Sequence, residues 1–251
     1  MPQRGRSLPF GGCFSPPPAM AGDGVGAVVL AAGEGRRMGA GRNKALLPLG
    51  GRPMLAWSLA LFDGAPEVGL VVLVVAEGER STFERLIGEG AGRKVKEIVS
   101  GGATRQQSEW NGLGAARRWM GEDGIVLVHD AARPFAPAAL LPALIGAAQE
   151  AGGAILATPA STGVVAAAAG VVTAFPSDLW AAQTPQAFVL RGILRAHEEA
   201  RAAGFAATDS AAVYERYGGT VRVVEGSADN VKVTTPEDLA LAEAIARRRP
   251  A

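Results

Sequence analysis

Apolar residues recur along the chain in two alternating patterns. Short runs rich in β-branched residues, typical of buried strands, lie at 27–31, 68–76, 95–99, 125–129, 154–158 and 221–225. Segments with one apolar face, typical of helices, lie at 54–62, 82–87, 106–120, 137–151, 190–203 and 209–217. This alternation predicts an α/β fold, with a mostly parallel sheet covered by helices on both faces.

The segment from 160 to 178 breaks this alternation. Two short β-prone pieces, 164–168 and 171–175, surround Gly170, which predicts a hairpin arm over about 159–179. The arm is rich in Ala and Val, and an apolar projection of this kind usually packs against a partner. We therefore expect one domain over 24–251 with an arm that forms a homodimer; a hairpin lying free on the surface is the alternative.

A final helix is indicated near the carboxyl end. Thr235 is a suitable N-cap, Pro236 suits the first helical position, and Glu237 and Asp238 place acidic groups in the first turn.

Composition excludes several classes of protein. Lys and Arg total 25 against 24 for Asp and Glu, a net charge of +1, which gives no electrostatic footprint for a nucleic-acid binder. The longest apolar runs are far shorter than the ~20 residues of a membrane-spanning helix. The single cysteine, Cys13, excludes an internal disulfide and favours a cytoplasmic location.

The first 23 residues carry arginines and three consecutive prolines but no apolar stretch resembling a signal peptide. We interpret residues 1–23 as a disordered tail. Met20 is an alternative start, and a transit peptide is a weaker alternative.

A glycine-rich turn follows the first predicted strand. It runs Leu-Ala-Ala-Gly-Glu-Gly-Arg-Arg-Met over 30–38, where small residues let backbone N–H groups approach a nucleotide closely. Arg37 supplies a cation for phosphates, and Lys44 is placed to fold back over them. The turn lacks the third glycine of a dinucleotide-binding loop and the Gly-Lys-Ser/Thr of a P-loop. An ordinary strand–helix turn with surface basic residues is the alternative.

A second motif, His-Asp-Ala-Ala-Arg-Pro over 129–134, ends the strand predicted at 125–129. Ligands of open α/β sheets bind at the carboxyl ends of strands, and a carboxylate there suits Mg²⁺ carried by a triphosphate. Asp130 is therefore the candidate Mg²⁺ ligand, with a helix N-cap as the alternative. Arg133 could bind a phosphate or help to hold the loop. We expect His129 to be structural.

A third motif, Asp-Asn-Val-Lys-Val-Thr over 229–234, follows the last predicted strand. Lys232 would add a cation near a transferring phosphorus, although alone it would be interpreted as a surface lysine.

The order and combination of these motifs resemble the 2-C-methyl-D-erythritol 4-phosphate cytidylyltransferase family of the non-mevalonate isoprenoid pathway. The resemblance covers about 25–246. It also includes Ser100-Gly101-Gly102 with Arg105 and Ser108, Gln-Thr-Pro-Gln over 183–186, and Thr208-Asp209. It implies a Rossmann-like sheet of the nucleotidyltransferase (GT-A-like) type, with a projecting β-hairpin arm.

The resemblance also implies roles for individual residues. The family's loop around the cytidine corresponds to Ala31, Ala32 and Gly33, and the segment that reads the base corresponds to Gly102, Ala103 and Ser108. The central loop at the nucleotide corresponds to Asp130 and Ala131. The catalytic cations correspond to Arg37, Lys44 and Lys232. Arg133 and Thr208 match substrate-binding groups. The implied reaction joins CTP to a small polyol phosphate with Mg²⁺ and releases pyrophosphate, which needs positioning and charge stabilisation rather than covalent chemistry.

The arm departs from the family pattern. Family members carry Asp-Thr-hydrophobic-Lys and a later Arg in the arm, and their Thr and Arg bind the partner subunit's acceptor phosphate. Here the matching stretch is 162–165 and the Arg position falls at about Pro176, with no Lys or Arg between 160 and 180. The acceptor phosphate could be held elsewhere, for example by Arg191 or Arg195.

Other functions are alternatives at this point. The chain could use another polyol phosphate or another base, it could be a catalytically weakened paralogue, or it could be a nucleotide-binding regulatory protein without turnover. A Rossmann dehydrogenase is disfavoured by the missing third glycine and by the absence of a ribose-binding acid after the second strand.

Overall fold

A computed structural model describes residues 24–33, 35, 43–161 and 163–249. The strands are β1 (Val25–Ala31), β2 (Pro48–Leu49), β3 (Arg52–Pro53), β4 (Val68–Val75), β5 (Val95–Ser100), β6 (Ile125–Asp130), β7 (Gly152–Pro159), β8 (Ala166–Ala168), β9 (Val171–Ala174), β10 (Trp180–Val189) and β11 (Thr220–Glu225). The α-helices are α1 (Met54–Gly64), α2 (Arg80–Gly88), α3 (Arg105–Trp119), α4 (Leu141–Ala151), α5 (Leu190–Ala202), α6 (Ser210–Arg216) and α7 (Pro236–Ala246), with short 3₁₀ turns η2 (Lys44–Leu46) and η3 (Ala138–Leu140). Residues 1–23, the predicted tail, lie outside the described part of the chain.

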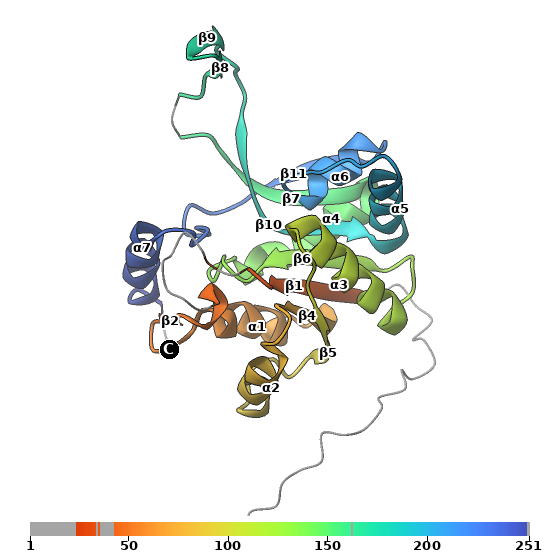
Figure 1. The fold of residues 1–251 in the computed structure, drawn as a ribbon, viewed down its shortest axis with the longest axis vertical. Helices are drawn as coiled ribbons and strands as arrows, with labels where there is room; N and C mark the ends of the chain where they lie inside the picture. The colour runs from red at the N-terminus through yellow and green to blue at the C-terminus, as the bar shows by residue number, and fades with distance from the viewer. Residues whose placement is uncertain (1–23, 34, 36–42, 162, 250–251) are drawn as a thin grey trace, which may run out of the picture.

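A seven-stranded sheet with the order β11-β7-β10-β6-β1-β4-β5 forms the centre of the molecule. Its neighbouring strands are parallel, except that β10 runs antiparallel to both β6 and β7. The expected α/β fold with a mostly parallel sheet is therefore confirmed (Figure 1). None of the described helices is long and apolar enough to cross a membrane.

Both faces of the sheet are covered, as the unbroken apolar runs predict. Ala27 and Val29 of β1 pack in one buried cluster with residues of α1, α2 and α4. Val28 points the other way and packs in a second cluster with residues of α3 and α5. Because side chains alternate along a strand, each central strand supplies both cores, and this fixes the register of the sheet.

The sequence analysis missed strand β10. Pro185 and the polar residues Gln183 and Gln186 interrupt its apolar pattern, and strands normally exclude proline. The structure accommodates this interruption with an irregularity, because the pairing of β10 with β7 shifts register between Gln183 and Gln186. Proline is tolerated at such bulges.

The arm leaves the sheet between β7 and β10. Its base is closed by the backbone N–H of Ala160, which donates to Leu179 O at 2.9 Å. Strands β8 and β9 pair at its tip, where Ala169 and Gly170 both have positive φ, as a tight hairpin turn requires. The arm projects well away from the rest of the molecule (Figure 1).

Helix boundaries mostly follow the predicted pattern. Thr235 caps α7, as expected, and the structure adds a capping box between Thr235 and Asp238. The predicted helix over 137–151 is wrong at its start, because η3 comes first and α4 begins only at Leu141, with Pro142 in its first turn. The hairpin of β2 and β3 was not predicted.

Candidate active site

A hollow of about 110 Å³ opens at the carboxyl end of β6, the edge where open α/β sheets bind ligands. Its walls come from α3, β6, β10, the loop before α6 and the segment after β11. The lining residues are Arg105, Asp130, Arg133, Ala182, Gln183, Thr184, Gln186, Thr208, Asp209 and Lys232. Four of these, Asp130, Arg133, Thr208 and Lys232, are residues that the sequence analysis selected.

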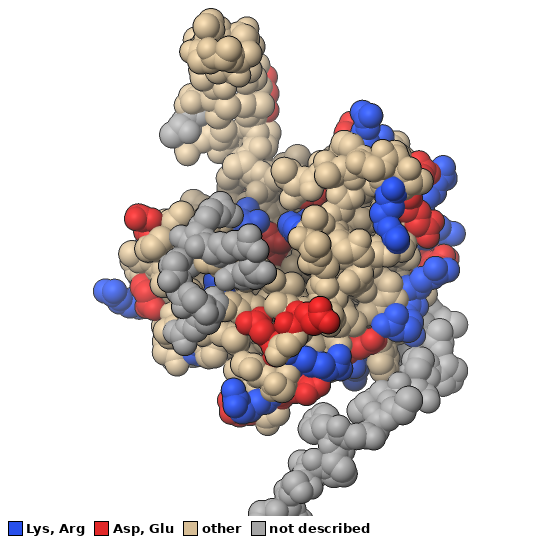
Figure 2. All heavy atoms as spheres, in the orientation of Figure 1, with Lys and Arg blue, Asp and Glu red and all other residues tan. Residues whose placement is uncertain are grey.

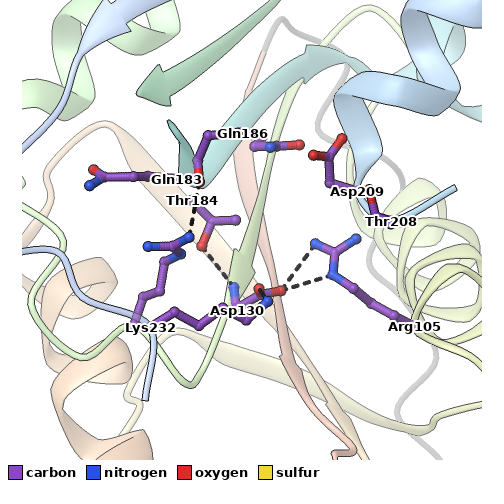
Figure 3. A pocket seen from close by; sticks show the side chains of 10 residues that line it. Arg105, Asp130, Gln183, Thr184, Gln186, Thr208, Asp209 and Lys232 are labelled. Carbon is purple, nitrogen blue, oxygen red and sulfur yellow. Dashed lines mark hydrogen bonds and ion pairs between the residues drawn. The ribbon is translucent and has the colours of Figure 1, made fainter. Parts of the chain in front are cut away.

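Asp130 lies at the centre of this hollow. It ends β6, so the helix N-cap alternative is wrong, and its Oδ2 lies 2.6 Å from Lys232 Nζ. Oδ1 lies 3.0 Å from Arg105 Nη2, and the two cations reach the carboxylate from opposite sides (Figure 3). Burial alone would raise the pKa of Asp130, but Arg105 and Lys232 outweigh it and hold the pKa far below its ordinary value. The carboxylate is therefore ionised at any physiological pH.

Arg105 is held between two acids. Its Nε donates to Asp130 Oδ1 at 3.1 Å, and its Nη1 donates to Glu109 Oε2 at 2.9 Å. Burial would lower the pKa of Arg105, but the two carboxylates outweigh burial and raise it. Sequence reasoning noted Arg105 only as part of a motif and gave it no role.

Arg133 has a different kind of environment. Its Nη1 donates to Asn230 O at 2.7 Å and its Nη2 to Ala182 O at 3.0 Å, so the guanidinium ties β10 to the segment after β11. Burial lowers the pKa of Arg133. Its buried Nε has no hydrogen-bond partner in the structure, which leaves one donor beside the hollow for a ligand oxygen.

The segment that carries Lys232 is anchored by a fully buried asparagine. Asn230 Nδ2 donates to Gln183 Oε1 at 3.1 Å and to Thr184 O at 3.0 Å. Further along, the N–H of Val233 donates to Ala132 O at 2.8 Å. These bonds fix the backbone on both sides of Lys232, whose side chain is still 38% exposed and therefore accessible to a ligand.

Lys44 lies beside the same segment. It begins η2, and its Nζ donates to Val233 O at 3.2 Å. The stem of Lys44 passes close to Gly33, because a Cβ placed on Gly33 would lie 3.7 Å from Lys44 Cε. The structure thus brings the first and third motifs together. Arg37 lies outside the described residues.

The loop after β5 packs against the glycine-rich turn. A Cβ on Gly101 would come within 2.6 Å of Ala32 Cβ, so the close approach of the two loops requires glycine. Ser108 Oγ accepts from the N–H of Gly102 at 3.0 Å and donates to Thr104 O at 2.9 Å. The hydroxyl of Ser108 therefore shapes the loop predicted to read the base.

Ala103, Ala131 and Ala31 complete the predicted nucleotide-binding set. Ala103 is exposed on the same loop as Gly102, while Ala31 and Ala131 are buried at the ends of β1 and β6. The N–H of Ala131 donates to Leu30 O at 3.0 Å, which aligns the two strand ends.

His129 is a structural residue, as expected. The ring is fully buried, with Nε2 3.2 Å from Ser58 Oγ and Nδ1 3.1 Å from Thr184 Oγ1. Burial is the largest cause that lowers its pKa to about 4, so the ring is neutral at pH 7. Thr184 Oγ1 in turn accepts from the backbone N–H of Asp130 at 3.1 Å, so these contacts orient the end of β6.

The Arg alternatives for the acceptor phosphate lie elsewhere. Arg191 pairs with Asp123, and its backbone N–H donates to Glu122 O, just before β6 begins. This is the amino end of β6, opposite the hollow. Arg195 pairs with Glu199 on the exposed face of α5. Neither of these arginines lines the hollow of its own chain.

The donor set fits a metal ion that arrives with a phosphate ligand. Among the described residues no group of three or more His, Cys, Asp or Glu could hold a resident metal. Asp130 offers one carboxylate whose oxygens already meet two cations, although a carboxylate has further lone pairs. Mg²⁺ takes one or two carboxylates plus phosphate oxygens and waters, so Asp130 suits a triphosphate-bound ion.

Sequence reasoning missed much of the rest of the site. Gln183, Thr184 and Gln186 belong to the unpredicted strand β10. Asp209 lines the hollow, its charge helps to raise the pKa of Arg105, and it caps α6 by accepting from the N–H of Ala212. Their only sequence signal was membership of the quoted motifs.

Comparison with known proteins identifies the family in which this arrangement occurs. The profile of the family described as IspD, 2-C-methyl-D-erythritol 4-phosphate cytidylyltransferase, matches residues 25–248. The enzyme of that name from Geobacillus thermodenitrificans is 47% identical over 225 residues, which cover 89% of this chain and 97% of the relative. The one from Geobacter metallireducens is 45% identical over 228 residues, with 90% and 98% covered.

Solved structures agree. The crystal structure of 2-C-methyl-D-erythritol 4-phosphate cytidylyltransferase from Thermus thermophilus has a TM-score of 0.73 and 34% identity, and covers 89% of this chain and 99% of that one. The 4-diphosphocytidyl-2C-methyl-D-erythritol synthase structure from Anaerococcus prevotii has a TM-score of 0.79 and 28% identity, with 90% and 97% covered. With its sheet, its strand-end hollow and nearly its whole length matched, this chain belongs to the 2-C-methyl-D-erythritol 4-phosphate cytidylyltransferase family.

Proposed function

We propose that this chain transfers CMP from CTP to 2-C-methyl-D-erythritol 4-phosphate and releases pyrophosphate, the activity for which its relatives are named. The observation that carries the proposal is the cationic hollow around Asp130 at the strand ends, which residues of the family motifs line. The family profile matches the chain over residues 25–248.

The reaction needs little covalent help from the protein. A phosphate oxygen of the acceptor attacks the α-phosphorus of CTP and forms a new P–O bond. The bond between the α-phosphorus and the bridging oxygen breaks, and pyrophosphate leaves with the electron pair. The acceptor phosphate is already ionised at neutral pH, so no general base is required. Catalysis therefore comes from alignment and from stabilisation of the charge on the transferring phosphoryl group.

The nucleotide is proposed to occupy the side formed by the glycine-rich turn. Ala31, Ala32 and Gly33 would wrap the cytidine, while backbone groups of Gly102 and Ala103 read the base. The bond between Ser108 and Gly102 supports this by holding the loop in shape. Ala131, which follows Asp130, would form part of the same nucleotide-binding surface.

The phosphates are proposed to lie over the cations at the strand ends. Lys44 and Arg37 would neutralise the triphosphate and the pentacoordinate phosphorus. Lys232 would stand beside the attacking oxygen, and Arg133 and Thr208 would contact the acceptor. The contact of Lys44 with Val233 supports a shared site for the two lysines.

Mg²⁺ is proposed to enter with CTP and to meet Asp130. When bound, the ion would neutralise triphosphate charge and assist departure of pyrophosphate. The role of this chain is to keep Asp130 ionised and oriented, which Arg105 and Lys232 support through their two ion pairs.

We also propose that the arm, residues 159–179, forms a homodimer. Large apolar side chains are exposed along it, including Phe175 at 80%, Val171 at 66% and Val172 at 47%. Exposed apolar surface of this extent favours a partner. Sedimentation of the wild type and of Phe175→Asp tests this. We expect a dimer that weakens in the variant, and a monomeric wild type would contradict the proposal. The cytoplasmic location stays a prediction.

The arm lacks the cations expected at an acceptor site, and Figure 2 shows no Lys or Arg atoms on its visible face. We propose that the acceptor phosphate meets Arg133 and Arg105 of its own subunit instead. The Michaelis constant for the acceptor should then exceed that of a family member whose arm carries the usual Arg. An ordinary value in the wild type, unchanged by Arg133→Ala, would contradict this.

Pyrophosphate release with CTP, Mg²⁺ and a panel of polyol phosphates tests the function. We expect turnover with 2-C-methyl-D-erythritol 4-phosphate to exceed that with pentitol phosphates, and CTP to exceed ATP, GTP and UTP. Preference for another polyol phosphate would favour the same-fold alternative. CTP binding without turnover would favour a weakened, nucleotide-binding paralogue.

A further inference from the structure

A chain of hydrogen bonds and ion pairs runs behind the hollow, from α5 through α3 to the end of β6. His197 Nε2 lies 3.0 Å from Glu109 Oε1, and Glu109 Oε2 accepts from Arg105 Nη1 at 2.9 Å. Arg105 meets Asp130 at 3.0 Å, and Asp130 meets Lys232 at 2.6 Å. The last three residues line the hollow, while Glu109 and His197 do not.

A gain in stability of the fold does not by itself explain why the carboxylate of Glu109 is buried. Its side chain is 1% exposed and that of His197 is 0% exposed, so both polar groups are removed from water. Replacing a buried ion pair with apolar side chains of similar volume is often neutral or stabilising. The contacts of Glu109 therefore point to control of the geometry of Arg105.

The geometry of Asp130 shows what this control achieves. Arg105 contacts only Oδ1 of Asp130, and Oδ2 is held by Lys232. A guanidinium facing a single carboxylate tends to bind both oxygens as a fork. Glu109 supplies a second carboxylate for the Nη1 side of Arg105, and so keeps Arg105 off the oxygen that Lys232 needs.

His197 maintains Glu109 in this role. An ionised carboxylate only accepts hydrogen bonds, so Nε2 of His197 carries the proton that points at Glu109. Burial alone would raise the pKa of Glu109, but the hydrogen bond from His197 and the charge of Arg105 outweigh burial and lower it. Glu109 therefore stays ionised at neutral pH.

We propose that Glu109 and His197 are positioning residues for nucleotidyl transfer, which act through Arg105 to keep Asp130 paired with Lys232. This inference rests on the proposed function. It assigns a part in the reaction to two side chains, on α3 and α5, that do not line the hollow.

Glu109→Gln is the first test, because the amide can still accept from Arg105 and donate to a His197 ring protonated at Nδ1. The fold should therefore survive. We expect kcat, per folded protein, to fall about tenfold while the Michaelis constant for CTP stays within about twofold, as for residues that orient a catalytic group. Glu97→Gln is the matched control: Glu97 also pairs with an arginine of α3, Arg118, but away from the hollow. Activity of the control should equal that of the wild type.

A double-mutant cycle separates positioning from a merely structural role. If Glu109 acts through Arg105, then Glu109→Gln should cause no further loss of kcat in an Arg105→Ala background. Losses that multiply in the double variant would overturn the proposal, as would a Glu109→Gln enzyme as active as the control.

Two variants of His197 test the other end of the chain. His197→Gln keeps a donor toward Glu109 and should retain most of kcat, whereas His197→Phe removes the donor and should lose about tenfold. Equal activity of the two variants would count against a role for the hydrogen bond.

A readout without turnover distinguishes this inference from the proposed function. Acetylation of Lys232 by acetic anhydride, followed by mass spectrometry, should be several-fold faster in Glu109→Gln than in the wild type and in Glu97→Gln. Unchanged reactivity would overturn the positioning role even in an active enzyme. If Glu109→Gln speeds acetylation of Lys232 but the wild type has no cytidylyltransferase activity, the proposed function is contradicted and the positioning role is not.

Discussion

Asp130→Asn removes the carboxylate that two cations share in the hollow. Breaking a buried ion pair by removing one partner costs about 3–5 kcal/mol. Lys232 is 38% exposed and can turn its ammonium toward water, and Arg105 keeps its contact with Glu109. We therefore expect the lower end of that range, about 3 kcal/mol of unfolding free energy at pH 7.

The loss of unfolding free energy in Asp130→Asn should depend on pH, and the structure gives the direction of this dependence. The pKa of Asp130 is depressed in the folded state, mainly by Arg105 and Lys232 acting against burial. An unfolded aspartate has a pKa of about 3.9. The stabilisation is therefore fully present above that value and is lost as the pH falls through the lower, folded-state pKa. The stability gap between wild type and variant should be full at pH 7 and should shrink below about pH 4.

Urea unfolding of both proteins at several pH values measures this gap, provided that the m-values agree. Asp229→Asn is the control, because the ion pairs of Asp229, with Arg248 at 3.3 Å and Arg249 at 3.9 Å, lie at the surface. It should cost less than about 1 kcal/mol. Two results would contradict a stabilising role for the ionised Asp130. One is an Asp130→Asn variant as stable as the wild type at pH 7; the other is a difference in unfolding free energy that does not change with pH.

Three other residues of the site give predictions of their own. Lys44→Ala should lower kcat about 10²-fold at nearly unchanged unfolding free energy, since it removes charge from the phosphate side; near-normal pyrophosphate release would remove that role. Gly101→Ala should destabilise the protein by about 1–3 kcal/mol and raise the Michaelis constant for CTP, because its Cβ would meet Ala32 Cβ at 2.6 Å; unfolding and kinetics that match the wild type would contradict this. The ring of His129 should stay neutral down to about pH 4, and an NMR titration midpoint near 6.5 for this ring would contradict its burial.

The sequence was sufficient to predict strands that are apolar on both faces. The runs at 27–31, 68–76 and 125–129 each became a central strand, because they are apolar throughout except for His129 at the end of the third. Strand β10 escaped prediction since its irregular centre contains Pro185 between polar residues, and only tertiary pairing with β6 and β7 makes it a strand.

The site was predictable where its chemistry lies in short motifs at strand ends. Asp130, Arg133 and Lys232 were selected in that way, and they do line one hollow. The pair of Glu109 and His197 was not accessible, because the two residues are 88 positions apart and nothing in the polar start of α3 marks its acid as buried.

Identification of the product is the most direct test of cytidylyl transfer by this chain. Purified protein incubated with CTP, Mg²⁺ and 2-C-methyl-D-erythritol 4-phosphate can be followed by ³¹P NMR. The account predicts that the resonances of CTP and of the acceptor monophosphate are replaced by those of one new diphosphate diester and of pyrophosphate, in equal amounts. Persistence of the acceptor monophosphate, or hydrolysis of CTP without the new diester, would contradict it.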